Sequence, residues 1–235
     1  RVDPRVGAQV DKINALIALA RELDPDQEIL KGDEEASFLE WVKSLVNQAL
    51  SIQNYSRNPG ERSMYAEHIQ IDIDNMYGES EATQEERDHV RIVNDYRLLM
   101  GRNALRINSK LTLASRGHSE YLRSTGQFAH VVPGHPQGAS PQDRARHFGY
   151  SGGVGENIAM HTGGHSAMTS FVAWYNSSGH HRNMLRPEYR VMGAGSAGTH
   201  WTQKFGSQTD GSEPRATGNH APLPNPAPAV GQLPR

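Results

Sequence analysis

The chain has 235 residues, a formal net charge of −2 and no cysteine. The near-neutral charge provides no broad basic surface, so nucleic acid is excluded as an expected partner. The lack of cysteine excludes disulfides, thiolate metal sites and cysteine nucleophiles. No apolar run reaches the roughly 20 residues of a membrane-spanning helix, so no transmembrane segment is expected. Because the sequence starts with Arg1 rather than Met, it is compatible with a signal peptide that has been removed.

Two amphipathic patterns occur near the start of the chain. Apolar residues recur at three- and four-residue steps within residues 10–23 and again within residues 38–50, which predicts two helices. We interpret them as a hairpin that covers a hydrophobic surface or a partner's helix. Residues 1–80 as a whole are therefore predicted to be a helical N-terminal region.

Capping signals predict several helices between residues 83 and 175. Thr83 and Glu86 form a capping box that begins one helix, and Gly101 is expected to end it. Ser109 is expected to cap a second helix, and Gly126 is expected to end it. Two further helices are predicted, one that begins at Ser140 and one that spans residues 166–175.

The last third of the chain contains a hairpin signal followed by a change in composition. Residues 191–197 and 200–205 are predicted strands that Gly198 and Thr199 join. After Gly206 the sequence is rich in proline and has few apolar residues. Residues 207–235 are therefore predicted to be a Pro-rich flexible tail.

Histidines are concentrated in one part of the sequence. Nine of the 12 lie between positions 118 and 200, a density that suggests a metal or acid–base site. Glu156 is a carboxylate that could orient an imidazole or complete a metal shell. His118 lies on an apolar helix face, where we expect a hydrogen-bonded core histidine. His161 and His165 have the spacing of a helical zinc pair, but two glycines separate them and the glutamate base of such motifs is missing.

The order of short segments is more informative than any single motif. The segments are Asn94-Asp-Tyr-Arg97, Phe128-Ala-His130, Gly155-Glu156-Asn157-Ile158, Trp174-Tyr-Asn-Ser177-Ser-Gly-His180 and Trp201-Thr-Gln-Lys-Phe205. In this order and spacing the sequence resembles the CAP superfamily of cysteine-rich secretory proteins, antigen 5 and plant pathogenesis-related proteins. The resemblance covers about half the chain, which we assign to residues 88–206. It implies an α+β fold, a three-layer α-β-α sandwich with a small antiparallel sheet and a cleft on one side.

The resemblance also implies a set of cleft residues. Members of the family commonly place two histidines and two acidic residues in the cleft, and His130, Glu156 and His180 match three of these positions. Ser177 stands where many eukaryotic members have the second glutamate, so the cleft has one carboxylate fewer. This version of the motif, like the lack of cysteine, is similar to the bacterial branch of the family.

The three cleft residues leave two functional classes open. His130, His180 and Glu156 could hold a divalent metal such as zinc with open positions for water, or they could form a hydrogen-bonded cleft without a metal. The first prediction is a secreted or envelope-associated, non-catalytic module that binds a metal or a small-molecule, lipid or protein ligand. The alternative is a metal- or histidine-assisted, protease-like hydrolase with the same three residues as catalytic candidates. A third interpretation places the function in the N-terminal helices, which would dock on a larger assembly.

Overall fold

The computed structural model describes residues 66–100, 102–162 and 166–218. The helices predicted at 10–23 and 38–50 lie outside the described residues. The elements are α3 (Ala66–Tyr77), α4 (Gln84–Leu99), β1 (Arg106–Ile107), α5 (Ser109–Thr125), α6 (Pro141–His147), β2 (Val154–Met160), α7 (Ala167–Tyr175), α8 (Ser178–Met184), β3 (Val191–Ala197) and β4 (His200–Gly206). None of these helices is both long enough and apolar enough to cross a lipid bilayer.

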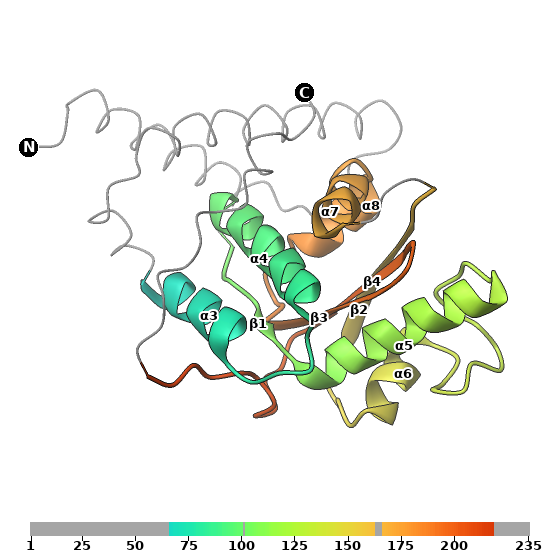
Figure 1. Cartoon of the computed structure of the whole chain (residues 1–235), viewed down its shortest axis with the longest axis horizontal. Coiled ribbons are helices and arrows are strands. Elements are labelled where there is room, and N and C mark those ends of the chain that lie inside the picture. Colours follow the sequence, from blue (N-terminus) through green and yellow to red (C-terminus); the bar gives the residue numbers. More distant parts are fainter. Residues whose placement is uncertain (1–65, 101, 163–165, 219–235) are drawn as a thin grey trace, which may run out of the picture.

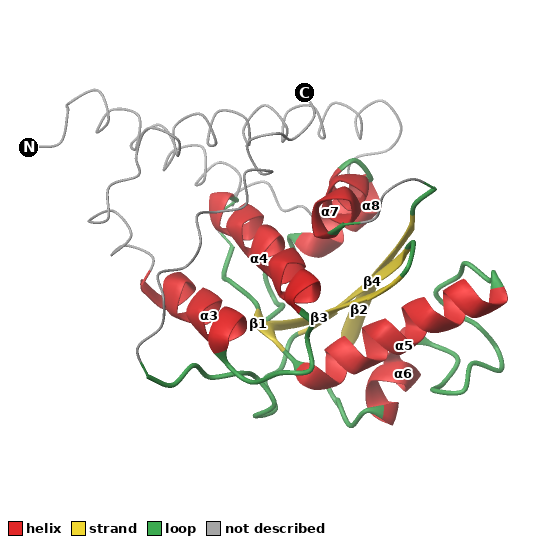
Figure 2. Ribbon diagram, in the orientation of Figure 1, coloured by secondary structure: helices red, strands yellow, loops and turns green. Residues whose placement is uncertain are grey.

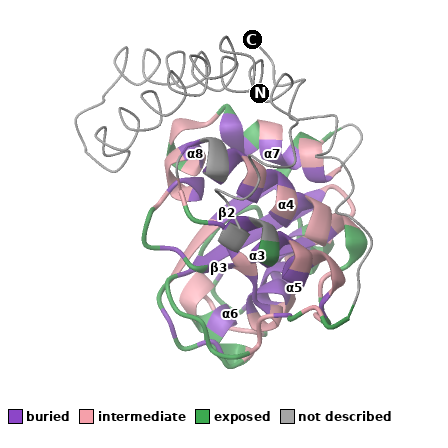
Figure 3. Ribbon diagram, turned by 90° about the vertical axis from the view of Figure 1, so that its left-hand side faces the viewer, coloured by how far each residue is buried: buried purple, intermediate pink, exposed green. Residues whose placement is uncertain are grey.

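Four strands form the central layer of the domain, in the order β1-β3-β4-β2. β4 pairs antiparallel with both β2 and β3, while the short β1 adds a parallel pair at the other edge of β3. Figures 1 and 2 show α4, α7 and α8 on one side of the sheet and α5 and α6 on the other. The predicted α+β sandwich is therefore confirmed, and buried residues concentrate in the sheet and the helix faces that cover it (Figure 3).

Aromatic side chains fill the core between the sheet and helices α4 and α7. Tyr96, Phe171, Trp174 and Trp201 are all buried in one cluster. The indole N–H of Trp174 donates to the carbonyl of Ile158 at 3.0 Å, so the one polar atom of this side chain is satisfied. This contact ties α7 to strand β2, which carries part of the candidate site.

On the opposite face, α5 lies unusually close to strand β3. A Cβ atom at Gly193 or Gly195 would overlap the backbone of α5. The hydroxyls of Ser115 and Ser119 donate to the carbonyls of these two glycines at 2.9 and 2.8 Å. The two glycines of the Gly-Ala-Gly segment are therefore explained by close packing between helix and sheet.

The helix caps among the described residues follow the sequence signals with one exception, while Gly101, the expected end of α4, lies outside the described residues. The Thr83 amide donates to Glu86 at 2.9 Å and the Glu86 amide to the Thr83 hydroxyl at 3.3 Å, which confirms that capping box. Gly126 ends α5 with a φ of 71°, as expected. Ser109 was the wrong cap for α5, because Asn108 holds the capping position and its side chain accepts from the amide of Leu111.

Strands β1 and β2 and helices α3 and α8 were not predicted as separate elements. Strand β2 lies within the stretch of glycine, proline and histidine, where no alternation of apolar residues marks a strand. α8 is only seven residues long and begins directly after α7. The strands depend on neighbours that are distant in sequence, since β1 pairs with β3 and β2 pairs along its whole length with β4.

The described part of the predicted tail, residues 207–218, makes several polar contacts with the domain. The side-chain amide of Asn108 donates to Asp210 at 2.9 Å and to Glu213 at 3.1 Å. The amide of Ala216 donates to Asp74 of α3 at 3.2 Å. The contacts of residues 207–218 with the domain are thus polar ones at single residues, which the composition did not reveal.

The close approach of α5 to β3 predicts a stability effect. Gly193→Ala should lower the free energy of unfolding by about 1–3 kcal/mol, because the added methyl group must displace helix backbone. Gly153→Ala is the matched control, since a Cβ there meets nothing within 4 Å. Urea unfolding monitored by circular dichroism measures both variants, and equal stability of the two would contradict this account of the packing.

Candidate functional site

Glu156 lies at the centre of the candidate site, on β2 and directly opposite Lys204 of β4. Its side chain is 2% exposed. The ammonium of Lys204 contacts one carboxylate oxygen. Nη2 of Arg144 donates to both carboxylate oxygens, at 3.1 and 3.0 Å. Nδ1 of His130 lies 2.9 Å from Oε1. The buried carboxylate of Glu156 therefore connects Lys204 of β4, Arg144 of α6 and the loop residue His130.

The cluster contains more buried positive charges than negative ones. Arg144 and Lys204 are both fully buried, so two cations share the negative charge of Glu156. Burial alone would raise the pKa of Glu156, but Lys204, His130 and Arg144 hold it well below its usual range. Burial lowers the pKa of Lys204 to about 8, against the opposing effect of Glu156. Both groups are therefore ionised at neutral pH.

The contact with Glu156 fixes the orientation of the His130 ring. Because an ionised carboxylate only accepts hydrogen bonds, a neutral His130 carries its proton on Nδ1, a tautomer assigned here from the hydrogen-bond geometry. The lone pair then lies on Nε2. The His130 side chain is 46% exposed, so Nε2 is available to accept a hydrogen bond from a ligand or to bind a cation.

His180 is placed by a chain of amide contacts around α8. The side-chain N–H of Asn157 donates to the carbonyl of His180 at 3.2 Å, and that of Asn183 donates to Asn157 at 2.9 Å. The hydroxyl of Tyr189 donates to Asn183 at 2.7 Å. Burial lowers the pKa of His180, and positive charge on nearby His130 lowers it further. The structure thus brings the three predicted residues, His130, Glu156 and His180, into one region.

An open pocket of about 470 Å³ adjoins this region. Its size falls in the range of about 300–1,000 Å³ that is usual for small-molecule sites. The lining is polar and includes two arginines; it consists of Glu156, Asn157, Gly179, His180, Arg182, Asn183 and Arg186. Such a lining suits a polar or anionic ligand better than an apolar one.

His118 lies next to Glu156, and its surroundings differ from those that the sequence predicted. It is fully buried, but neither ring nitrogen has a hydrogen-bond partner within the described residues. Its Nε2 is 3.7 Å from Glu156, and its ring centroid is 5.4 Å from that of His135. Burial lowers the pKa of His118 to about 3, so this ring stays neutral beside the cations. A hydrogen-bonded core histidine was therefore the wrong prediction.

Three other histidines lie apart from this site. His147 is exposed, and His181 is buried with Nδ1 2.7 Å from the carbonyl of Tyr175. Nε2 of His161 lies 3.1 Å from the hydroxyl of Ser170. His165 lies outside the described residues, so its spacing with His161 stays an observation on the sequence.

Sequence reasoning missed Arg144 and Lys204, although both contact Glu156. The sequence holds a weak signal for Lys204, because a lysine that points inward from a predicted strand needs a partner of opposite charge. That partner is the directly opposite residue of β2, but the pairing becomes visible only once β2 is recognised as a strand. Arg144 gave no signal, since an arginine on a short helix is usually solvated.

Sequence comparisons identify relatives over the same part of the chain. The family model described as "CAP: Cysteine-rich secretory protein family" matches residues 90–205. The "Uncharacterized protein YkwD" of Bacillus subtilis is 33% identical over 123 residues, which are 51% of this chain and 46% of that protein. The matched part therefore spans about half the length of this curated relative.

Structure comparison finds similar solved structures. One is an extracellular protein containing a SCP domain from Bacillus anthracis, with a TM-score of 0.46, 22% identity and coverage of 53% of this chain and 42% of that chain. Another is an outer surface protein from Borrelia burgdorferi, with a TM-score of 0.46, 19% identity and coverage of 56% of this chain and 99% of that chain.

The buried charge cluster predicts a large effect of removing its central anion. Glu156→Gln should lower the free energy of unfolding by about 3–5 kcal/mol at pH 7, because it leaves two buried cations without this counter-charge. Glu188→Gln is the control, since Glu188 forms an exposed pair with Arg186 at 2.7 Å and should cost about 0–1 kcal/mol. Urea unfolding compares the two variants, and equal costs would refute the role given to Glu156.

The same cluster predicts a direction for the pH dependence. The pKa of Glu156 is lower in the folded than in the unfolded chain, where a glutamate has a value of about 4.3. Its stabilising contribution is therefore present above pH of about 4.3 and is lost as the pH falls through the folded value. The stability difference between the wild type and Glu156→Gln should shrink in acid. A difference that grows as the pH falls would contradict the lowered pKa.

Proposed function

Residues 90–205 of this chain form a CAP domain of the bacterial type, and we propose that the protein is a secreted or envelope-associated binding module. In this proposal the cleft of His130 and His180 binds a ligand without catalysing a reaction. The observation that carries it is the state of Glu156, whose carboxylate is already engaged by three side chains.

The state of Glu156 weakens the case for a hydrolase. A general base needs an accessible lone pair and a pKa near the working pH. Glu156 is 2% exposed, and its neighbours keep its pKa far below neutrality. Its carboxylate is therefore suited to orienting His130 rather than to taking a proton from water. The cleft then presents prearranged imidazole and amide groups, which is what a binding site requires.

A divalent metal such as zinc fits the two imidazoles only in part. Nε2 of His130 and the ring of His180 are suitable donors, and Glu156 would orient the first of them as carboxylates do behind metal-bound histidines. The oxygens of Glu156 are engaged by Arg144 and Lys204, so they add no ligand. Two protein ligands are fewer than the three of catalytic zinc sites, which favours weak binding. When bound, the cation would supply a positive anchoring point for an anionic ligand.

The pocket lining indicates the class of ligand. Arg182, Arg186 and His180 surround an open space with amide side chains between them. These groups favour a polar or anionic small molecule, or the polar part of a lipid or protein surface. The family description as secretory supports an extracellular or envelope location for this chain.

Zinc provides a direct probe of the cleft. In calorimetric titration at pH 7.5, His130→Ala and His180→Ala should each weaken zinc binding at this site at least tenfold, because each removes one of two imidazole ligands. His147→Ala should have no effect, since His147 is exposed on α6 outside the pocket. A zinc affinity and a number of bound ions that neither cleft substitution changes would show that these histidines do not hold the cation.

A hydrolysis assay separates the two functional classes. With and without zinc, the purified chain should release no more product from fluorescently labelled casein than a buffer blank. The Glu156→Gln variant is the control for a contaminating protease, because contamination would persist in it. Activity of the wild type that disappears in His130→Ala would overturn the proposal in favour of the hydrolase.

A further inference from the structure

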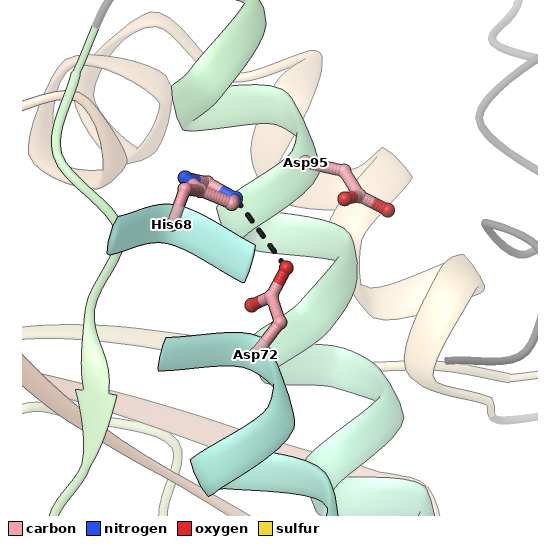
Figure 4. A group of neighbouring side chains, drawn as sticks. All are labelled: His68, Asp72 and Asp95. Atoms are coloured by element: carbon pink, nitrogen blue, oxygen red, sulfur yellow. Dashed lines mark ion pairs between the residues drawn. The ribbon is translucent and has the colours of Figure 1, made fainter. Parts of the chain in front are cut away.

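A second group of possible metal ligands lies away from the cleft, where α3 packs against α4. His68 and Asp72 stand one helical turn apart on α3, and Asp95 lies across from them on α4 (Figure 4). One ligand atom from each residue lies within 4.8 Å of the other two. His68 and Asp72 are buried, while Asp95 is partly exposed.

Two of these side chains carry buried atoms without hydrogen-bond partners. Within the described residues, Nε2 of His68 and Oδ2 of Asp95 accept or donate no hydrogen bond. His68 is only 8% exposed, and its Nε2 is turned toward Asp72 (Figure 4). A buried polar atom left unsatisfied costs about 1–3 kcal/mol, so this arrangement lacks a partner that a cation would supply.

Asp72, the remaining candidate ligand, is already oriented by a hydrogen bond. The side-chain N–H of Asn94 donates to Oδ1 of Asp72 at 3.1 Å, which leaves Oδ2 facing His68. Such a hydrogen bond behind a ligating carboxylate is typical of protein metal sites. Asp72 and Asp95 also bring two carboxylates close to one imidazole, so a cation between them would balance their negative charges.

The distances suit a small transition metal. Nε2 of His68 lies 3.4 Å from Oδ2 of Asp72. Two ligands bound tetrahedrally to zinc at about 2.0–2.2 Å are separated by about 3.3–3.6 Å. The ligand atom of Asp95 lies within 4.8 Å of the other two, so a movement of about 1–1.5 Å would bring it to a similar spacing. An imidazole with two carboxylates favours zinc over the all-oxygen sites of calcium and magnesium.

We propose that His68, Asp72 and Asp95 form a zinc-type metal site that joins α3 to α4. Helix α3 precedes the residues that match the CAP family, so the ion would fasten the preceding segment to the domain. This site is independent of the cleft and does not rest on the proposed function. The main competing explanation is that Arg91, and not a metal ion, balances the charge of Asp95. Arg91 lies one turn before Asp95, and the positive charge of Arg91 lowers the pKa of Asp95.

The test uses the full chain with His130 and His180 both replaced by alanine, which removes the cleft histidines. In this background, calorimetry should detect one zinc ion per chain. Zinc at a hundredfold excess over the dissociation constant should raise the melting temperature by about 5–10 °C. Asp95→Asn should fold as well as the background without metal, because Oδ2 of Asp95 makes no hydrogen bond within the described part of the chain.

Asp95→Asn and, separately, His68→Gln should each weaken zinc binding at least tenfold and abolish the rise in melting temperature. Asp88→Asn is the matched control on α4, where the aspartate accepts from the side chain of Gln84 at 2.9 Å, and it should leave both unchanged. Zinc binding that is unaffected by Asp95→Asn and His68→Gln would overturn the site. An absence of zinc binding in the variant without the cleft histidines would also overturn the site and would leave Arg91 as the charge partner of Asp95. Stabilisation by calcium but not by zinc would overturn the choice of metal.

Discussion

The carboxylate of Glu156, buried between Arg144 and Lys204, is the interaction on which the cleft depends. Leaving either cation without this anion inside the protein would cost several kcal/mol, so β2, β4 and α6 have to assemble together. Arg144 also donates to the carbonyl of His130 at 2.8 Å. The same guanidinium therefore holds both the loop that carries His130 and the carboxylate that orients its ring. Stability and the geometry of the candidate site have a common origin here, which explains why the acid is buried although it lies beside an open pocket.

The sequence predicted those parts of the fold that have local signals. The capping box at Thr83, the end of α5 at Gly126 and the hairpin at Gly198 each follow from residues that are close together in the chain. The α-β-α sandwich and the gathering of His130, Glu156 and His180 came from the order of motifs. Lys204 was missed for a physical reason. Its partner is set by the pairing of β2 with β4, and strand pairing depends on residues distant in sequence.

The segments on either side of the residues that match the family are held by single polar contacts. Asn75 of α3 donates to the carbonyl of Leu105 at 2.9 Å and accepts from the amide of Ile107 at 2.8 Å. α3 thereby satisfies backbone groups beside β1, outside the residues that match the family. Asn108 in turn holds the segment after β4 through Asp210. Helix periodicity and proline content describe these segments in isolation and carry no information on such long-range amide contacts.

The protonation state of Glu156 tests the central claim most directly. With the chain labelled with ¹³C at the glutamate side chains, the carboxyl resonance of Glu156 can be assigned by its loss in Glu156→Gln and followed from pH 7 to pH 3. We predict that Glu156 stays ionised throughout, because Lys204, His130 and Arg144 stabilise its charge. A protonation midpoint at or above the ordinary value of about 4.3 would contradict the account, since Glu156 would then lack the ion pairs that organise the cleft.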